Sequence, residues 1–161
     1  MGQYHLTCNL SKKEWLDPHR LGDGLKLWEQ GASQGGILNA LHALLAVSNG
    51  RGGGDYITSY PEFVGRWGGD RIAIVGDYAK ANDLSATDYA ELIYERCSDG
   101  SEGWTDISDL ARDFLSEQWN LEFGNDGWVT RTAQEGSVFG PRSGPAMRPD
   151  TVIVVNPPEE S

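Results

Sequence analysis

The chain has 161 residues, 39% of them hydrophobic, and carries a formal net charge of −11 at pH 7. This length suits one domain with a buried core. The negative charge disfavours nucleic-acid binding because phosphate backbones repel it. The longest apolar run, near residues 37–47, is too short to span a membrane, and the N-terminus lacks the order of a secretory signal. We therefore expect a cytoplasmic protein that binds neither nucleic acid nor membrane.

The first half of the chain is predicted to form two strands and two helices. Alternating apolar residues predict a half-buried strand over 3–10. Asp23 is expected to cap a short helix over 24–30 that buries Leu25 and Trp28. Apolar spacing of three and four predicts a helix over 37–48, closed by a left-handed cap at Asn49-Gly50. The run over 72–75 predicts a buried central strand.

The second half is predicted to begin with two helices. A capping-box pattern from Ser85 to Asp88 opens a helix that ends near Cys97, and a second helix covers about 106–120. Strands over 121–123 and 128–132 flank Asn125-Asp126-Gly127, which is a strong hairpin signal. These elements predict a single compact α+β domain over residues 1–133, with a small mixed or antiparallel sheet and three to four helices. A Gly/Pro-rich loop (134–150), a final strand (151–155) and a flexible tail (156–161) complete the prediction.

The two cysteines, Cys8 and Cys97, are too few for a disulfide framework. We expect both to be free thiols in a reducing compartment. Because Cys8 and His5 fall on opposite faces of the predicted strand, they are not expected to share a ligand. Cys8 is instead expected to belong to the core.

One segment carries a recognisable pattern. Residues 67–78 read W-G-G-D-R-I-x-I-x-G-D-Y, and residues 2–4, 9–10, 12–14 and 19–27 support the same match. In these residues the chain resembles a group of short uncharacterised proteins of actinobacteria and their phages, with more distant fungal relatives. The resemblance covers roughly residues 1–130. It implies no activity and no catalytic residue, but it places residues 65–78 in the shared architecture rather than in a linker.

The glycine-rich loops between residues 50 and 77 are a candidate ligand site. Glycines let a backbone approach a ligand closely, and arginine can grip a phosphate or carboxylate with a forked pair of N–H groups. Neither loop has the P-loop or the dinucleotide-binding pattern. The alternative is that these loops are turns in which Arg66 or Arg71 pairs with Asp70 or Asp77. The candidate ligand-binding residues are Arg51, Asp55, Arg66, Trp67, Asp70, Arg71 and Asp77.

The sequence gives no pattern for a metal or a cofactor. Asp17, His19 and Asp23 lie close together along the chain and can in principle hold a divalent ion or transfer protons. No spacing typical of a zinc site supports this. The alternative is a polar loop in which Asp17 begins a turn and Asp23 caps a helix. We expect no metal site and no cofactor.

Acidic residues are concentrated over residues 81–126, which hold twelve carboxylates and two arginines. Helical spacing predicts one acidic stripe on each of the two helices. Such stripes suit a basic protein partner and steer its approach, or they form a solvated face that aids solubility. The candidate partner-binding residues are Asp88, Glu91 and Glu95 on the first helix, and Asp106, Asp109, Asp113 and Glu117 on the second.

Three functions follow as hypotheses. The first is a non-enzymatic acidic interaction or inhibitor protein that binds a basic partner through the helices of residues 81–126. The second is a small enzyme or binding protein for a phosphorylated or nucleotide ligand, using the loops at 50–77. The third is a phage virion or assembly component. The sequence leaves open whether the protein is an enzyme.

Overall fold

A computed structural model describes residues 2–32, 35–123, 129–132 and 152–155. It has α1 (Leu27–Ala32), α2 (Ile37–Leu45), α3 (Ala90–Asp99) and α4 (Ser108–Trp119), with short 3₁₀ helices η1 (His19–Leu21) and η2 (Ser101–Gly103). The strands are β1 (His5–Asn9), β2 (Glu14–Leu16), β3 (Ile72–Gly76), β4 (Thr105–Asp106), β5 (Leu121–Phe123), β6 (Val129–Thr132) and β7 (Val152–Val155). In this part of the chain, no helix is long and apolar enough to cross a membrane.

The main sheet has four strands in the order β3-β1-β2-β4. Strand β1 pairs antiparallel with both β2 and β3, whereas β2 and β4 run parallel. The domain is therefore α+β with a mixed sheet, as predicted. Strands β5, β6 and β7 form a second, antiparallel sheet. The turn at Asn125-Asp126-Gly127, the loop of 134–150 and the tail of 156–161 lie outside the described residues.

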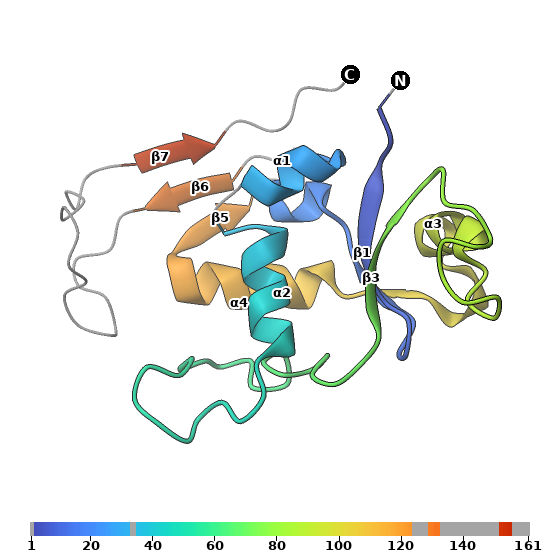
Figure 1. The fold of residues 1–161 in the computed structure, drawn as a ribbon. Helices are drawn as coiled ribbons and strands as arrows, with labels where there is room; N and C mark the ends of the chain where they lie inside the picture. The colour runs from blue at the N-terminus through green and yellow to red at the C-terminus, as the bar shows by residue number, and fades with distance from the viewer. Residues whose placement is uncertain (1, 33–34, 124–128, 133–151, 156–161) are drawn as a thin grey trace.

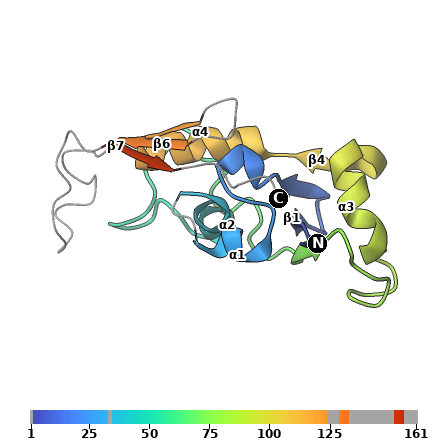
Figure 2. The ribbon, with the colours of Figure 1, turned by 90° about the horizontal axis from the view of Figure 1, so that it is seen from above.

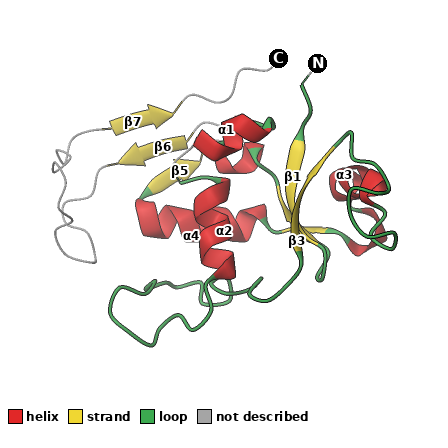
Figure 3. Ribbon diagram, in the orientation of Figure 1, coloured by secondary structure: helices red, strands yellow, loops and turns green. Residues whose placement is uncertain are grey.

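Helices cover both faces of the main sheet (Figures 1 and 2). On one face, α2 and α4 pack against Leu16 and share a core with Phe63 and Trp67. On the other face, α3 packs against a second cluster that contains Leu6, Cys8, Trp15 and Val75. In Figure 3, the red helices accordingly lie on both sides of the yellow strands β1 and β3.

This layering corrects two strand predictions. Strand β1 was expected to be half-buried, but its residues Leu6–Asn9 are all buried because helices or loops cover both of its faces. Strand β3 was expected to be central, but it lies at the edge of the sheet, and Ile74 is 46% exposed. The central position belongs to β1 and β2 instead. Neither β2 nor β4 was predicted, because strands of three and two residues are too short to show a periodicity.

Helix boundaries also differ from the expected ones. The first helix begins at Leu27, and Trp28 is 85% exposed rather than buried. Helix α3 begins at Ala90, not at the Ser85 capping box. Asp88 still accepts a hydrogen bond from the Ser85 N–H, but it does so within a turn that precedes the helix.

Helix α2 is capped at both ends by distant residues. At its start, the buried carboxylate of Asp23 accepts the Ile37 N–H at 2.7 Å, so Asp23 caps this helix rather than the one over 24–30. At its end, the carbonyls of Ala43 and Leu44 accept the N–H groups of Gly65 and Trp67. The helix therefore ends at Leu45, three residues before its expected end at residue 48. Tertiary contacts thus satisfy the end groups that a helix leaves unpaired.

Candidate functional site

The loop at residues 50–55 is closed on itself. The Asp55 carboxylate accepts the N–H groups of Gly50, Arg51 and Gly52 at 2.8, 2.8 and 3.0 Å. These hydrogen bonds lower the pKa of Asp55 from its ordinary value. Arg51 is exposed, and its guanidinium has no ion-pair partner among the described residues. The N–H groups that could hold an anion are therefore occupied by Asp55.

Arg66 and Trp67 meet at a carboxylate that the sequence did not single out. Glu14 is buried on β2. Its two oxygens accept the Arg66 Nε–H at 3.1 and 2.9 Å, and one of them also accepts the Trp67 indole N–H at 2.8 Å. The pair raises the pKa of Arg66. Both candidate residues thus hold the loop after α2 against the sheet.

The other candidates have separate partners. Asp70 accepts hydrogen bonds from Lys12 and from the Asn9 side-chain amide. Both hydrogen bonds lower the pKa of Asp70, and the one from Lys12 has the larger effect. Asp77 accepts the Tyr4 N–H at 3.0 Å.

Arg71 forms two hydrogen bonds with Asp88. The expected pairing of Arg66 or Arg71 with Asp70 or Asp77 is therefore wrong. The seven residues do not converge on one point; most of them make structural contacts of their own.

The acidic stripe of α4 is largely engaged within the protein. Arg20 binds the carboxylates of both Asp106 and Asp109. Glu117 accepts the Ser59 N–H at 2.7 Å and the Thr58 hydroxyl proton. These contacts tie α4 to η1 and to the loop before Phe63, and they leave Asp113 as the exposed acid of the stripe without a described contact.

The acidic stripe of α3 differs from the predicted one. Asp88 lies before the helix and pairs with Arg71. On the helix itself, Glu91, Glu95 and Asp99 follow one another at intervals of four residues, and all three are exposed. Glu102 follows in η2 and is exposed as well. We call Glu91, Glu95, Asp99 and Glu102 the acidic α3 face; in the described chain, none of these side chains forms an ion pair.

The two stripes do not form one surface. Helices α3 and α4 belong to different core clusters on opposite faces of the main sheet, and they lie apart in Figure 2. Asp99 and Glu102 were not among the candidates; Asp99 continues the four-residue spacing of α3, whereas Glu102 lies beyond the helix in η2. The structure shows which of these acids already have hydrogen-bond partners: Asp88, Asp99, Asp106, Asp109 and Glu117.

The Asp17, His19 and Asp23 group serves local structure. Asp17 accepts the His19 N–H at 3.0 Å and so begins a turn, while Asp23 caps α2. Across the described ranges, no group of three or more His, Cys, Asp or Glu side chains is placed to hold a metal ion. Cys8 and Cys97 are free thiols, as predicted, and both are buried.

Comparison of the chain with protein-family models, with curated proteins and with solved structures found no match. Function is therefore argued from the surface that the described residues form.

Proposed function

We propose that this protein is a non-enzymatic interaction protein that binds a basic protein partner through the acidic α3 face. The observation that carries the proposal is the set of exposed carboxylates on α3 and η2 that form no ion pair with any described residue. Their repulsion at i, i+4 spacing costs the free protein a few tenths of a kcal/mol for each pair. A basic partner relieves this repulsion on binding and is steered toward the face by the net charge of −11.

The proposal narrows the sequence hypothesis to one of the two helices. The carboxylates of Asp106, Asp109 and Glu117 already have hydrogen-bond partners, so a ligand that used them would have to replace intramolecular contacts. On the acidic α3 face, Asp99 accepts the Ser101 N–H at 2.8 Å, whereas Glu91, Glu95 and Glu102 have no side-chain contact in the described chain that a ligand would have to replace. No described contact favours the second hypothesis, a phosphate or nucleotide site in the loops at 50–77.

The test is affinity capture of the tagged protein from its native host at low salt, followed by elution with a salt gradient. The variant Glu91→Lys/Glu95→Lys reverses two charges on the acidic α3 face. The matched control, Asp113→Lys/Glu122→Lys, changes the net charge equally but alters exposed residues on α4 and β5.

We expect the wild type and the control to retain a basic partner to the same salt concentration, because the control alters residues outside the acidic α3 face. The α3 variant should release it at much lower salt. Equal retention by all three proteins would contradict the proposal, and so would equal loss in both variants, because net charge alone would then explain capture.

A further inference from the structure

The outer edge of β3 carries backbone groups that pair with no other described residue. On its inner side, the Arg71 carbonyl accepts the Leu10 N–H, and the Asp77 N–H donates to the Tyr4 carbonyl. Because pairing alternates along an antiparallel ladder, the backbone groups of Ile72 and Ile74 point away from β1. Nowhere in the described ranges does a hydrogen bond occupy these outward groups.

This edge lacks the usual protection against strand pairing. Natural edge strands are commonly very short, charged, bulged or interrupted by proline. The opposite edge strand, β4, has only two residues. By contrast, β3 has five residues, Ile-Ala-Ile-Val-Gly, with no charge and no proline. Its side chain at Ile74 is 46% exposed.

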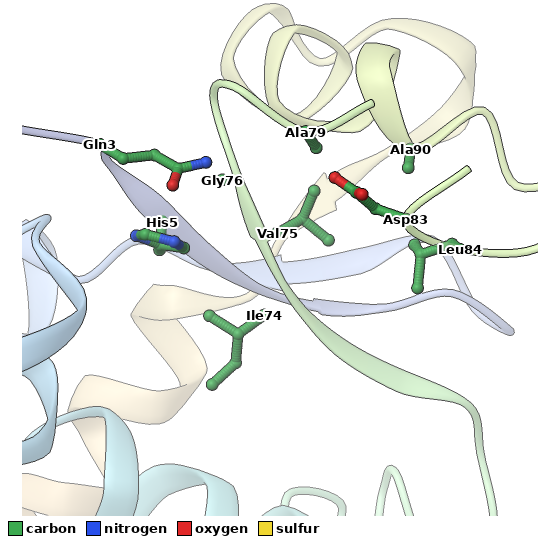
Figure 4. Close-up of a pocket in the computed structure, with 9 residues that line it drawn as sticks. All are labelled: Gln3, His5, Ile74, Val75, Gly76, Ala79, Asp83, Leu84 and Ala90. Atoms are coloured by element: carbon green, nitrogen blue, oxygen red, sulfur yellow. The ribbon is translucent and has the colours of Figure 1, made fainter. Parts of the chain in front are cut away.

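A recess of about 190 Å³ runs beside the second half of this strand. In Figure 4, His5 and Ile74 lie on one side of β3, and Asp83, Leu84 and Ala90 lie on the other. Gly76 adds no side chain to the lining. The volume is smaller than that of pockets for drug-sized ligands, which begin at roughly 300 Å³. It instead suits a side chain of a peptide that lies along the strand.

The wall on the α3 side is negative. The carboxylate of Asp83 extends toward β3 from the loop that returns to α3 (Figure 4). One of its oxygens accepts the Lys80 N–H at 2.8 Å, and the exposed side chain forms no ion pair in the described chain. Ala90 lines the recess and is the first residue of α3, directly before Glu91. The recess therefore opens beside the acidic α3 face, and it favours a lysine or arginine side chain.

We propose that an extended segment of the basic partner adds as a fifth strand along the outer edge of β3. Its main chain pairs with Ile72 and Ile74, and one of its basic side chains enters the recess beside Asp83. Strand addition to a free edge is a common mode of peptide recognition. A second copy of this chain is a poorer occupant, since it brings another net charge of −11 to the same edge. The inference that the partner is basic rests on the proposed function, whereas the description of the β3 edge is independent of it.

The experiment selects binders from a displayed library of random linear peptides. Ile74→Pro removes the outward N–H while leaving the inner ladder intact, because edge strands tolerate proline at such positions. Gly53→Pro, in the exposed loop with open space around it, is the matched proline control. Asp83→Lys tests the charge without altering the strand, and circular dichroism checks that each variant is folded.

We expect the selected peptides to share a basic residue within a proline-free stretch. Their affinity should fall at least about tenfold for Ile74→Pro and for Asp83→Lys, and remain unchanged for Gly53→Pro. On binding, the amide protons of Ile72 and Ile74 should become protected from hydrogen exchange, whereas those of Ala73 and Val75 already are.

The inference is overturned if no peptide is enriched, if the peptides bind Ile74→Pro as tightly as the wild type, or if protection is confined to α3. It is also overturned if Ile72 and Ile74 become protected with rising protein concentration alone, which would indicate a second copy. When the captured partner is lost with Glu91→Lys/Glu95→Lys but retained by Ile74→Pro and Asp83→Lys, the edge inference alone fails. Retention by the α3 variant contradicts the proposed function itself.

Discussion

The indole N–H of Trp67 donates to a carboxylate oxygen of Glu14 at 2.8 Å, and both residues are buried. This contact joins β2 to the loop after α2, and Arg66 binds the same carboxylate from the less buried side. A buried carboxylate is tolerated because these donors replace the water that it loses. The contact explains why a tryptophan in a polar, glycine-rich segment belongs to the core.

Replacing Glu14 with glutamine is expected to destabilise the protein by about 2–3 kcal/mol, because it weakens the charged hydrogen bonds of Arg66 and Trp67. Chemical denaturation measures the change in the free energy of unfolding. The control Glu122→Gln, at an exposed position on β5, should change it by less than about 0.5 kcal/mol. Equal effects of the two substitutions would show that the Glu14 contacts add nothing to stability.

The same carboxylate should contribute to acid sensitivity. Burial raises the pKa of Glu14, but the hydrogen bonds of Arg66 and Trp67 outweigh it, so the pKa is lowered from its ordinary value. A carboxyl group with a lowered pKa in the folded state stabilises the protein above its unfolded pKa, about 4.3. That contribution is lost as the pH falls through the folded pKa. Unfolding measured from pH 6 down to about pH 3 should show a steeper loss for the wild type than for Glu14→Gln; parallel curves would contradict this.

Gly65 and Gly69 form a matched pair for testing the loop that caps α2. Both have a positive φ, +77° and +81°. A Cβ at Gly65 would lie 2.7 Å from the Ala46 carbonyl oxygen, whereas a Cβ at Gly69 meets open space. Gly69→Ala should therefore lower the free energy of unfolding only by the cost of holding alanine in the left-handed conformation, about 1 kcal/mol. Gly65→Ala should cost at least about 1 kcal/mol more, because overpacking against the backbone adds to that term. Equal shifts in thermal denaturation would show that the Ala46 contact relaxes freely.

Asp23 and Gly36 are predicted to be energetically coupled. Gly36 has a negative φ of −106°, so its backbone is not in the left-handed conformation. A Cβ at this position would nevertheless lie 2.3 Å from the Asp23 carboxylate. Asp23→Ala alone should cost about 1–2 kcal/mol through loss of the α2 cap. In a double-mutant cycle, Gly36→Ala should be clearly less destabilising in the Asp23→Ala background; additive effects would rule out the clash.

The two thiols should be inert in the folded protein. The Sγ atoms of Cys8 and Cys97 lie 3.9 Å apart, and the side chains are 0% and 2% exposed. The hydrogen bond with Cys97 and burial raise the pKa of Cys8, and the thiolate is the form that reacts. Alkylation at pH 8 should be slow under native conditions and fast in denaturant. Rapid native labelling of both thiols would contradict the packing of α3 on β1.

The sequence predicted elements whose signals are local. Helices α3 and α4 follow from apolar spacing of three and four, and the pairing of β5 with β6 follows from two short strands around a turn sequence. The position of β3 was wrong because a continuous apolar run marks burial but not order within a sheet. That order depends on β2, whose three residues carry no periodic signal.

The candidate sites also combine local features, which the sequence predicted, with contacts that depend on the fold, which it did not. The acidic character of residues 81–126 could be read directly, and so could the presence of stripes. The sequence could not show which carboxylates form hydrogen bonds within the protein, because Asp88 meets Arg71, and Glu117 meets the 58–59 loop, only after folding. The role of Glu14 was missed for the same reason. Its partners, Arg66 and Trp67, lie more than fifty residues away along the chain.

The pairing of β2 with β4 has a consequence for synthesis on the ribosome. Trp15 aligns with Asp106, so the sheet at the start of the chain is not complete until residues near 106 have left the exit tunnel. Until then a nascent chain has neither β4 nor α4, and the face of β2 that carries Leu16 lacks the α4 part of its cover. Folding of this domain should accordingly be late and concerted during translation rather than progressive, and stalled chains that end before residue 105 should be sensitive to protease.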